Sequence, residues 1–374
     1  MRIRGLSLAI ALGSAAALPG CEFDLFECRP SDPGPDRSVR EVHGTYVSSA
    51  TTDAAITWSP SGEEVTFVSA DYRIAYARHV LSGAMRQLYA SNTPGEGIVD
   101  AQLSADGVDW FTTSFNVGDT IGWNVVRRHT SAGSTVLTDR GIGGFEHRTW
   151  MRWVLVAPGQ PVVAFIVSPD SLFLLRRGGE PTLLGSGCFG IVAFSPDESQ
   201  VLCPDGTSSL RVFRTDGGAA ESLVFPPEIN VGFADLIRWG EEGIQVLYWG
   251  GDHYLLYEHA SGSSRPFTQA PNSPEYTVGV GRVSWSSDGR KVAYWNEYGA
   301  QIAGRSCSQG SREYIGGILQ GFLYVLDVAT GTTTRVAVHT STEYSLLDSR
   351  VAVSPTGSMV AYMVNGGFYL LEVG

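Results

Sequence analysis

A tight polar turn between an apolar residue and a short apolar strand recurs along this chain and constrains its fold more than any other feature. Five copies are clear: Trp58-Ser-Pro-Ser-Gly62, Leu103-Ser-Ala-Asp-Gly107, Phe194-Ser-Pro-Asp-Glu198, Trp285-Ser-Ser-Asp-Gly289 and Val353-Ser-Pro-Thr-Gly357. Two degenerate copies lie at residues 156–159 and 239–243. In such a turn proline presets φ, serine and aspartate oxygens accept backbone N–H groups, and glycine adopts positive φ. Seven copies of one hairpin indicate a repeat architecture.

The spacing of the repeat predicts the size of each unit. The apolar anchors are Trp58, Leu103, Val156, Phe194, Trp239, Trp285 and Val353, and 38 to 68 residues separate neighbours. Repeats of roughly 40–50 residues with four strands each are typical of β-propeller blades. The strand after each turn is almost continuously apolar, as in residues 291–296, which is typical of strands covered on both faces. We therefore expect an all-β, seven-bladed β-propeller, with six or eight blades as the less favoured counts.

The last unit lacks one strand, and the start of the chain has one to spare. Residues 322–331 and 254–262 are third strands that run into a glycine turn, and a more polar fourth strand follows at 332–338 and 263–268. The equivalent third strand at 368–373 is followed only by Gly374. Residues 39–48 form a strand-like segment with no unit of its own. We expect this segment to complete the last blade and so close the ring.

The first twenty residues resemble a leader and not a part of the fold. Arg2 and Arg4 precede an apolar stretch that ends in Leu18-Pro-Gly-Cys21. A basic start, an apolar stretch and small residues before a cleavage site are typical of secretory signal peptides, and this ending resembles a bacterial lipobox. Residues 1–20 are therefore predicted as a lipoprotein signal peptide, 21–38 as a tether and 39–374 as the propeller, with Cys21 as the lipid attachment site. An ordinary signal peptide is the alternative.

The charge balance limits the classes of partner. The formal net charge is −12, and removal of Arg2 and Arg4 with the leader makes it −14. A net-negative surface argues against nucleic acid and against broad attraction to anionic lipid. We expect contact with a membrane only through the lipid anchor, on the periplasmic side or the cell surface, with the outer membrane favoured.

Four further cysteines could pair in an oxidising compartment. Cys28 lies in the tether and Cys307 in a long insertion, so both are expected to be accessible and are a candidate disulfide. Cys188 and Cys203 fall on neighbouring predicted strands, about three residues out of register, so pairing and burial as small apolar groups both stay open. No Cys-x-x-Cys spacing supports a zinc or redox site.

The repeat resembles a known family. The Ser-Pro-Asp-Gly turn, the following Val-Ala-Tyr strand (residues 292–294) and the later Leu-Tyr-Val-Leu-Asp strand (residues 323–327) resemble TolB-type repeats, a branch of the WD-repeat-like propellers. The resemblance covers residues 39–374. It implies scaffolding in the periplasm or envelope, with partners bound through the propeller faces.

The sequence contains no recognisable catalytic constellation. It has no His-Glu-x-x-His helix, no Gly-x-Ser-x-Gly elbow and no metal-ligand spacing, so we expect neither an enzyme nor a metal or other cofactor. The turn aspartates Asp106, Asp197 and Asp288 are predicted to accept backbone N–H groups. The anchor tryptophans Trp58, Trp239 and Trp285 are assigned to the core.

Two regions are candidates for recognition. The sixth unit contains an insertion, residues 298–321, and loops longer than about 15 residues in a compact domain are usually functional or disordered. Its candidate contact residues are Arg305, Arg312, Glu313 and Tyr314. Trp150 and Trp153 follow a glycine-rich stretch and form a candidate aromatic face, with inter-blade packing as the alternative.

The function expected from these features is a lipid-anchored, non-catalytic module that binds a protein or envelope polymer. The alternative is an envelope glycan hydrolase or lyase in the propeller funnel, which would need two carboxylates or a histidine converging there. A sensor or structural subunit of a larger envelope machine is a third reading.

Overall fold

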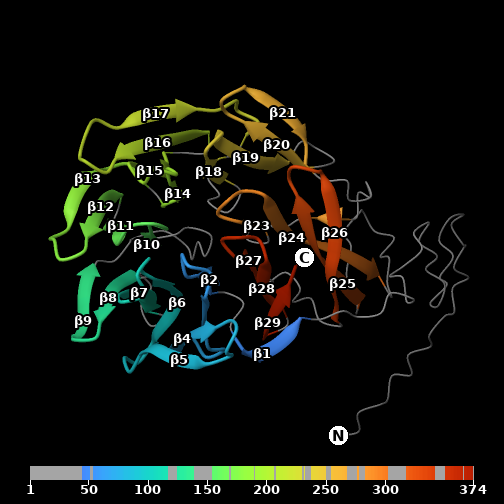
Figure 1. Ribbon diagram of the computed structural model, residues 1–374, viewed down its shortest axis with the longest axis horizontal. Helices are drawn as coiled ribbons and strands as arrows, with labels where there is room; N and C mark the ends of the chain where they lie inside the picture. The colour runs from blue at the N-terminus through green and yellow to red at the C-terminus, as the bar shows by residue number, and fades with distance from the viewer. Residues whose placement is uncertain are drawn as a thin grey trace, which may run out of the picture.

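Seven antiparallel sheets follow one another around a central axis (Figure 1). The computed structural model describes residues 44–50, 54–116, 124–138, 154–167, 170–188, 190–205, 208–229, 231, 237–249, 254–267, 276–277, 283–301, 317–341, 350–364 and 366–373. All regular structure in these residues is β-strand. The chain is therefore a seven-bladed, all-β propeller, as the repeat predicted.

Each blade contributes one strand to the centre and one beside it. The innermost strands are β2 (Thr57–Trp58), β6 (Glu96–Leu103), β10 (Val154–Val156), β14 (Ala193–Phe194), β18 (Ile237–Gly240), β23 (Val283–Trp285) and β27 (Arg350–Val353). The second strands are β3 (Glu64–Val68), β7 (Trp110–Asn116), β11 (Val162–Val167), β15 (Gln200–Pro204), β19 (Gly243–Trp249), β24 (Lys291–Gln301) and β28 (Met359–Val364). All seven predicted anchors lie in the innermost strands.

The third and fourth strands form the outside of the ring. The third strands are β4 (Ile74–His79), β8 (Asn124–Thr130), β12 (Ser171–Arg176), β16 (Ser209–Arg214), β20 (Tyr254–Glu258), β25 (Gly317–Asp327) and β29 (Gly367–Glu372). The fourth strands are β5 (Met85–Ala90), β9 (Gly133–Thr138), β13 (Thr182–Gly185), β17 (Glu221–Val224), β21 (Ser263–Pro266), β26 (Thr332–Ser341) and β1 (Thr45–Ser49). A short strand, β22 (Tyr276–Thr277), pairs with β24.

The hydrophobic core is divided among the interfaces between blades. Five of six residues in β11 and in β28 are buried, whereas all four residues of β21 are exposed. Val351 and Tyr362 of the last blade pack in one cluster with Trp295 and Leu323 of the sixth. The continuous apolar strands are thus covered by a neighbouring blade on each face, as their sequences indicated.

The recurring turn is built by its serine and aspartate. Ser104 Oγ donates a 2.7 Å hydrogen bond to Asp106 Oδ1 and accepts one of 3.0 Å from the Asp109 N–H. Gly107 closes the turn at φ 68°. The serine contact to the N–H five residues on recurs in four other copies. The turn aspartates are therefore structural acceptors, as predicted.

Connections gather on two faces according to strand order. The links from first to second and from third to fourth strands leave one face, which we call the turn face, and all of them are described. The links from second to third strands and between blades start and end on the opposite face, which we call the loop face. Every internal segment outside the described residues is a link of this second kind. The two faces therefore differ in the kind of connection they carry.

The N-terminal strand lies in the last blade. β1 pairs antiparallel with β29 from Thr45 opposite Leu370 to Ser49 opposite Gly367, with a register shift between Tyr46 and Ser48. It takes the place of the missing fourth strand in the sheet β27-β28-β29. The predicted segment was residues 39–48; the observed strand begins later, and 39–43 lie outside the described residues.

The predicted loop of the sixth blade is partly strand. β24 and β25 pair without interruption from Lys291 opposite Asp327 to Gln301 opposite Gly317, so residues 298–301 and 317–321 belong to an extended hairpin. The prediction was wrong for these residues because backbone pairing with a partner strand offset their high glycine content. Residues 302–316 lie outside the described residues.

Cys188 and Cys203 form a disulfide, with Cα atoms 5.6 Å apart. The expected three-residue mismatch was wrong because Cys188 is not on a strand; it lies in the link that follows β13. A link can bring its side chain to β15 independently of strand register. Both cysteines are fully buried.

A buried ionic cluster lies in the second blade, where the link from the first blade enters it. Glu96 is 5% exposed and accepts a 2.7 Å hydrogen bond from Ser91 Oγ, together with bonds from Ser114 and Arg127. Burial raises the pKa of Glu96, but the hydrogen bonds from Ser114 and Ser91 and the charge of Arg127 outweigh this effect, so its pKa is lowered. The cluster is therefore a fully partnered, charged carboxylate in the core.

His129 lies beside this cluster and makes stability depend on pH. It is 2% exposed and lies between the rings of Tyr89 and Trp110. Burial, with the Arg127 charge, lowers the pKa of His129 to about 4. The unfolded chain therefore binds more protons between about pH 6.5 and about pH 4, and stability falls as pH falls through this window.

We predict that wild-type protein loses about 2 kcal/mol of unfolding free energy between about pH 7 and about pH 5 through His129. A His129→Asn variant should lose much less over the same interval, because asparagine does not titrate. Urea denaturation at the two pH values measures both changes. Equal pH dependence in the two proteins would contradict the assignment to His129.

Candidate functional site

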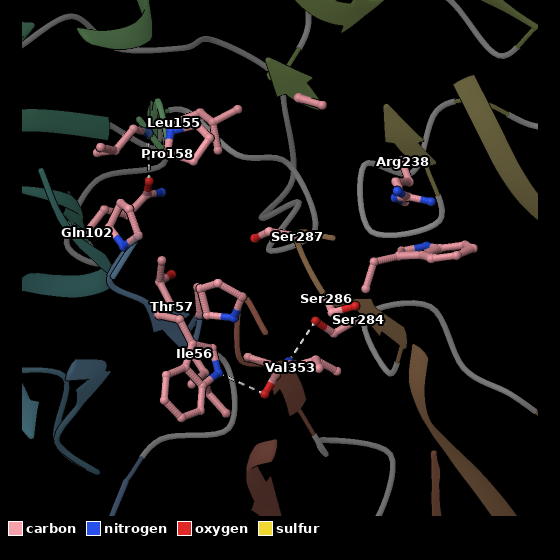
Figure 2. Close-up of a pocket in the computed structure, with 18 of the residues that line it drawn as sticks. Ile56, Thr57, Gln102, Leu155, Pro158, Arg238, Ser284, Ser286, Ser287 and Val353 are labelled. Atoms are coloured by element: carbon pink, nitrogen blue, oxygen red, sulfur yellow. Dashed lines mark hydrogen bonds between the residues drawn. The ribbon is translucent and has the colours of Figure 1, made fainter. Parts of the chain in front are cut away.

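A central cavity of about 320 Å³ lies where the innermost strands of all seven blades converge. Its lining includes Ile56, Gln102, Pro158, Ser287 and Val353 from different blades, and Figure 2 shows their side chains around the opening. Concave sites that combine apolar walls with a few polar groups are typical ligand sites. The cavity is therefore the candidate functional site of the described residues.

The three anchor tryptophans pack in the core and also line the cavity. Trp58 is buried, as predicted. Trp239 and Trp285 are partly buried and also line the cavity, and each packs against a cluster of buried core residues, as predicted. The reason is geometric, because the innermost strand of a propeller faces the central channel as well as its neighbouring blades.

Side chains of the innermost strands tie neighbouring blades together. Gln102 Nε2 donates a 2.7 Å bond to the Val154 carbonyl, and its Oε1 accepts a 3.1 Å bond from the Val156 N–H. Trp58 Nε1 donates to the Ala352 carbonyl at 3.0 Å, across the junction of the first and last blades. These bonds satisfy backbone groups that no neighbouring strand pairs, so they stiffen the cavity wall.

Ser284 and Thr57 make the same kind of contact at two further junctions. Ser284 Oγ accepts a 3.1 Å bond from the Val353 N–H, and Thr57 Oγ1 donates to Asp100 Oδ1 at 3.3 Å. Ser284 and Thr57 each directly precede an anchor, as Gln102 does. The repeat makes that position recognisable in the sequence, although it does not reveal the partner.

Arg238 fills the cavity wall between the fifth and sixth blades. Its Nη1 donates to Gln245 Oε1 at 3.0 Å and its Nη2 donates to the Asp288 carbonyl at 3.1 Å. The guanidinium lies 5.8 Å from the centre of the Trp285 ring, a cation–π distance. Gly289 leaves the space that the guanidinium occupies, because a Cβ there would lie 1.5 Å from Arg238 Cζ.

Gly289→Ala should therefore destabilise the protein more than Gly107→Ala. The two glycines have nearly the same φ, 67° and 68°, so each substitution carries a similar backbone penalty of about 1–2 kcal/mol. A Cβ at Gly107 meets nothing within 4 Å, whereas one at Gly289 displaces Arg238. We expect a further loss of about 1–3 kcal/mol at Gly289, measured by chemical denaturation. Equal losses would contradict the packing role of Arg238.

The cavity does not bring together the groups that a two-carboxylate glycosidase needs. Among the described lining residues, Asp100 is the single carboxylate, and none is a histidine. Gln102 Nε2 donates a 2.7 Å bond to Asp100 Oδ2, so this carboxylate is held in place by the wall. Arg238 and Arg350 supply the positive charge.

The sequence-predicted site residues fall outside the described part of the chain. This applies to Cys21, Cys28, Cys307, Arg305, Arg312, Glu313, Tyr314, Trp150 and Trp153. The strand ends that flank 302–316, Gln301 and Gly317, lie at the loop face. The sequence did not single out Gln102, Arg238 or Glu96, whose importance comes from partners distant in the chain.

The turn carboxylates are engaged in local hydrogen bonds. Asp197 accepts bonds from Ser195 Oγ at 2.6 Å and from the Ser199 N–H at 3.1 Å, which lower its pKa. Asp106 has a lowered pKa for the same reasons and also pairs with Arg177 at 2.5 Å. Both are charged acceptors at neutral pH.

The described residues contain neither a metal-binding cluster nor a membrane-spanning helix. No group of three or more His, Cys, Asp or Glu side chains there is placed to hold a metal ion. No helix among them is long and apolar enough to cross a bilayer.

Comparison with solved structures places the fold. A chain of the mitotic checkpoint complex aligns over 100% of this chain and 99% of its own length, with a TM-score of 0.52 and 12% identity. The β-propeller domain of Myceliophteria thermophila Cps50 (Swd1) aligns over 90% and 99%, with a TM-score of 0.50 and 12% identity. Saccharomyces cerevisiae Sqt1 aligns over 90% and 100%, with a TM-score of 0.50 and 14% identity. The chain therefore has a WD-repeat-like β-propeller fold.

At these identities the likeness concerns the fold alone. No protein-family model and no curated protein matches the sequence. Function must therefore be argued from this chain's own residues.

Proposed function

We propose that this chain is an exported, lipid-anchored β-propeller that binds a protein or envelope polymer, as its TolB-type resemblance implies. The observation that carries the proposal is the division of the disc into two unlike faces. Tight turns occupy the turn face, and all longer connections begin and end at the loop face. Binding residues are found disproportionately on loops held by a rigid scaffold.

The cavity wall supplies that rigidity. Side-chain hydrogen bonds cross the junctions between innermost strands at Thr57, Gln102, Arg238 and Ser284. A rigid frame reduces the entropy lost on binding, because the presenting residues are already positioned.

Two observations support export and anchoring. The Leu18-Pro-Gly-Cys21 segment follows a basic and apolar leader. The Cys188–Cys203 disulfide is typical of an oxidising compartment such as the periplasm. Lipid on Cys21 would hold the protein stably when two or more acyl chains are attached.

Membrane fractionation of the full chain and a Cys21→Ser variant tests the anchor. Wild type should pellet with membranes and the variant should be exported but soluble. Wild-type protein that remains soluble, or a variant that pellets equally, would contradict lipid attachment.

Affinity capture from detergent-solubilised envelopes tests the recognition role. Arg305→Glu/Arg312→Glu should lose the captured partner, whereas Arg290→Glu, an exposed arginine on the turn face, should retain it. The same partner captured by all three proteins would contradict recognition through residues 305–314. Capture lost by Arg290→Glu alone would assign binding to the turn face instead.

A further inference from the structure

The direction of β1 determines where the N-terminal tether joins the disc. Ala50, just after β1, donates its N–H to the Gly366 carbonyl at 3.0 Å, in the turn between β28 and β29. That turn belongs to the loop face. β1 therefore ends at the loop face, and its first residue lies toward the turn face.

The opposite end of the same sheet confirms this polarity. The Val373 N–H donates to the Ser358 carbonyl at 2.8 Å, beside the Ser354–Gly357 turn. Thr45 pairs with Leu370, near the end of β29. Gly44, the first described residue, therefore lies toward the turn face.

The attachment point is held firmly by side chains of two blades. The Gly44 N–H donates to Tyr362 Oη at 2.7 Å, and the same oxygen lies 3.2 Å from His339 Nε2 of the sixth blade. Tyr362 stacks on Tyr369 at 5.1 Å, and Tyr46 packs edge-on against Tyr369. A Cβ on Gly44 would lie 2.5 Å from the Leu370 carbonyl oxygen, so the backbone is closely packed there.

The average reach of the tether is comparable with the thickness of the disc. A flexible segment of the length between Cys21 and Gly44 has a root-mean-square span of about 26 Å. A strand of about six residues already spans about 20 Å from face to face. To bring the loop face to the bilayer, the tether would have to follow the disc edge for most of that reach, which restricts its conformations.

The turn face also carries charge that anionic lipid repels. Exposed carboxylates there include Glu63, Asp106, Asp197, Glu241 and Asp288. Charges of one sign on a protein surface and on a lipid headgroup layer repel over about one Debye length. Close adhesion of this face to an anionic bilayer is therefore opposed.

We propose that the lipid anchor holds the disc with its turn face toward the bilayer, while repulsion between the turn-face carboxylates and anionic lipid prevents close contact. The loop face is then presented to a partner outside that bilayer. This inference rests on the anchoring proposed above. It adds that the loop face is the face free to bind. A partner embedded in the membrane leaflet that holds the anchor is therefore excluded as the target of the loop face.

Energy transfer from the protein to the bilayer tests this orientation. The lipidated full chain, with Cys28→Ser and Cys307→Ser, is reconstituted on phosphatidylcholine–phosphatidylglycerol vesicles that contain an acceptor lipid. A donor dye is placed at Ala329→Cys on the turn face or at Ala70→Cys on the loop face. Both alanines are exposed, lie in tight turns, and belong to the blades on either side of the last one. The buried disulfide cysteines do not react.

Transfer should be at least about twofold greater from position 329 than from position 70, given the spans above. Equal or reversed transfer on vesicle-bound protein would overturn the orientation and leave the anchor intact. Protein that fails to float with the vesicles would overturn the anchor itself. A Cys21→Ser variant should give no energy transfer from either position. Transfer from position 329 in that variant would show that the turn face adheres to the bilayer, which would contradict the proposed repulsion.

Discussion

Arg127→Met is expected to lower the free energy of unfolding by about 3–5 kcal/mol, the cost of leaving a buried charge without its partner. Glu96 is nearly inaccessible, and Arg127 donates both to it and, at 2.7 Å, to Ser114 Oγ. Methionine keeps much of the apolar stem but removes the counter-charge. Urea denaturation at neutral pH measures the loss.

Arg86→Met is the matched control, because Arg86 pairs with Glu64 at 2.9 Å near the surface. Exposed ion pairs contribute about 1 kcal/mol or less, so the two variants should differ severalfold. In Arg127→Met the pKa of Glu96 should rise, because burial then dominates. The carboxyl group protonates as pH falls, so the difference in unfolding free energy between Arg127→Met and wild type should become smaller in acid. Equal losses of unfolding free energy in the two variants would contradict the role of the buried pair, as would a difference between Arg127→Met and wild type that does not change with pH.

Removing the disulfide with Cys188→Ala/Cys203→Ala should cost about 3 kcal/mol. The two cysteines are 15 residues apart, and cross-linking a loop of this length lowers the entropy of the unfolded chain by about that amount. The midpoint of urea denaturation without reductant should fall accordingly.

A reducing agent provides the internal control for this prediction. Both cysteines are fully buried, so a reductant reaches them only after unfolding. Reductant should lower the midpoint of wild-type protein toward that of the double variant and should leave the variant unchanged. Identical midpoints for wild type and variant without reductant would contradict a stabilising bridge.

Local signals in the sequence were sufficient for the architecture. Ser104, Asp106 and Gly107 build their turn from neighbouring atoms, so the pattern of residues specifies the geometry without distant partners. Seven such turns at blade spacing predicted seven blades, and all seven anchors lie on innermost strands. The apolar second strands indicated coverage by neighbouring blades because burial on both faces removes alternation.

Contacts between distant residues were beyond the same reasoning. Cys188 bonds to Cys203 from a link between strands, and strand register does not predict the path of a link. Part of the sixth-blade insertion is strand because β24 and β25 continue to pair, although its composition favoured a loop. Gln102 gains its role from Val154 and Val156 of the next blade, and a side-chain amide in a short strand does not indicate such a partner.

The amino-acid sequence by itself determined the fold class, the blade count and the structural role of the turn aspartates, because each follows from a hairpin that neighbouring residues build and that recurs along the chain. The tertiary structure alone decided the composition of the cavity wall, the buried Glu96–Arg127 pair and the polarity of β1. These depend on contacts between residues tens to hundreds of positions apart in the chain, and such contacts leave no periodic pattern in the sequence.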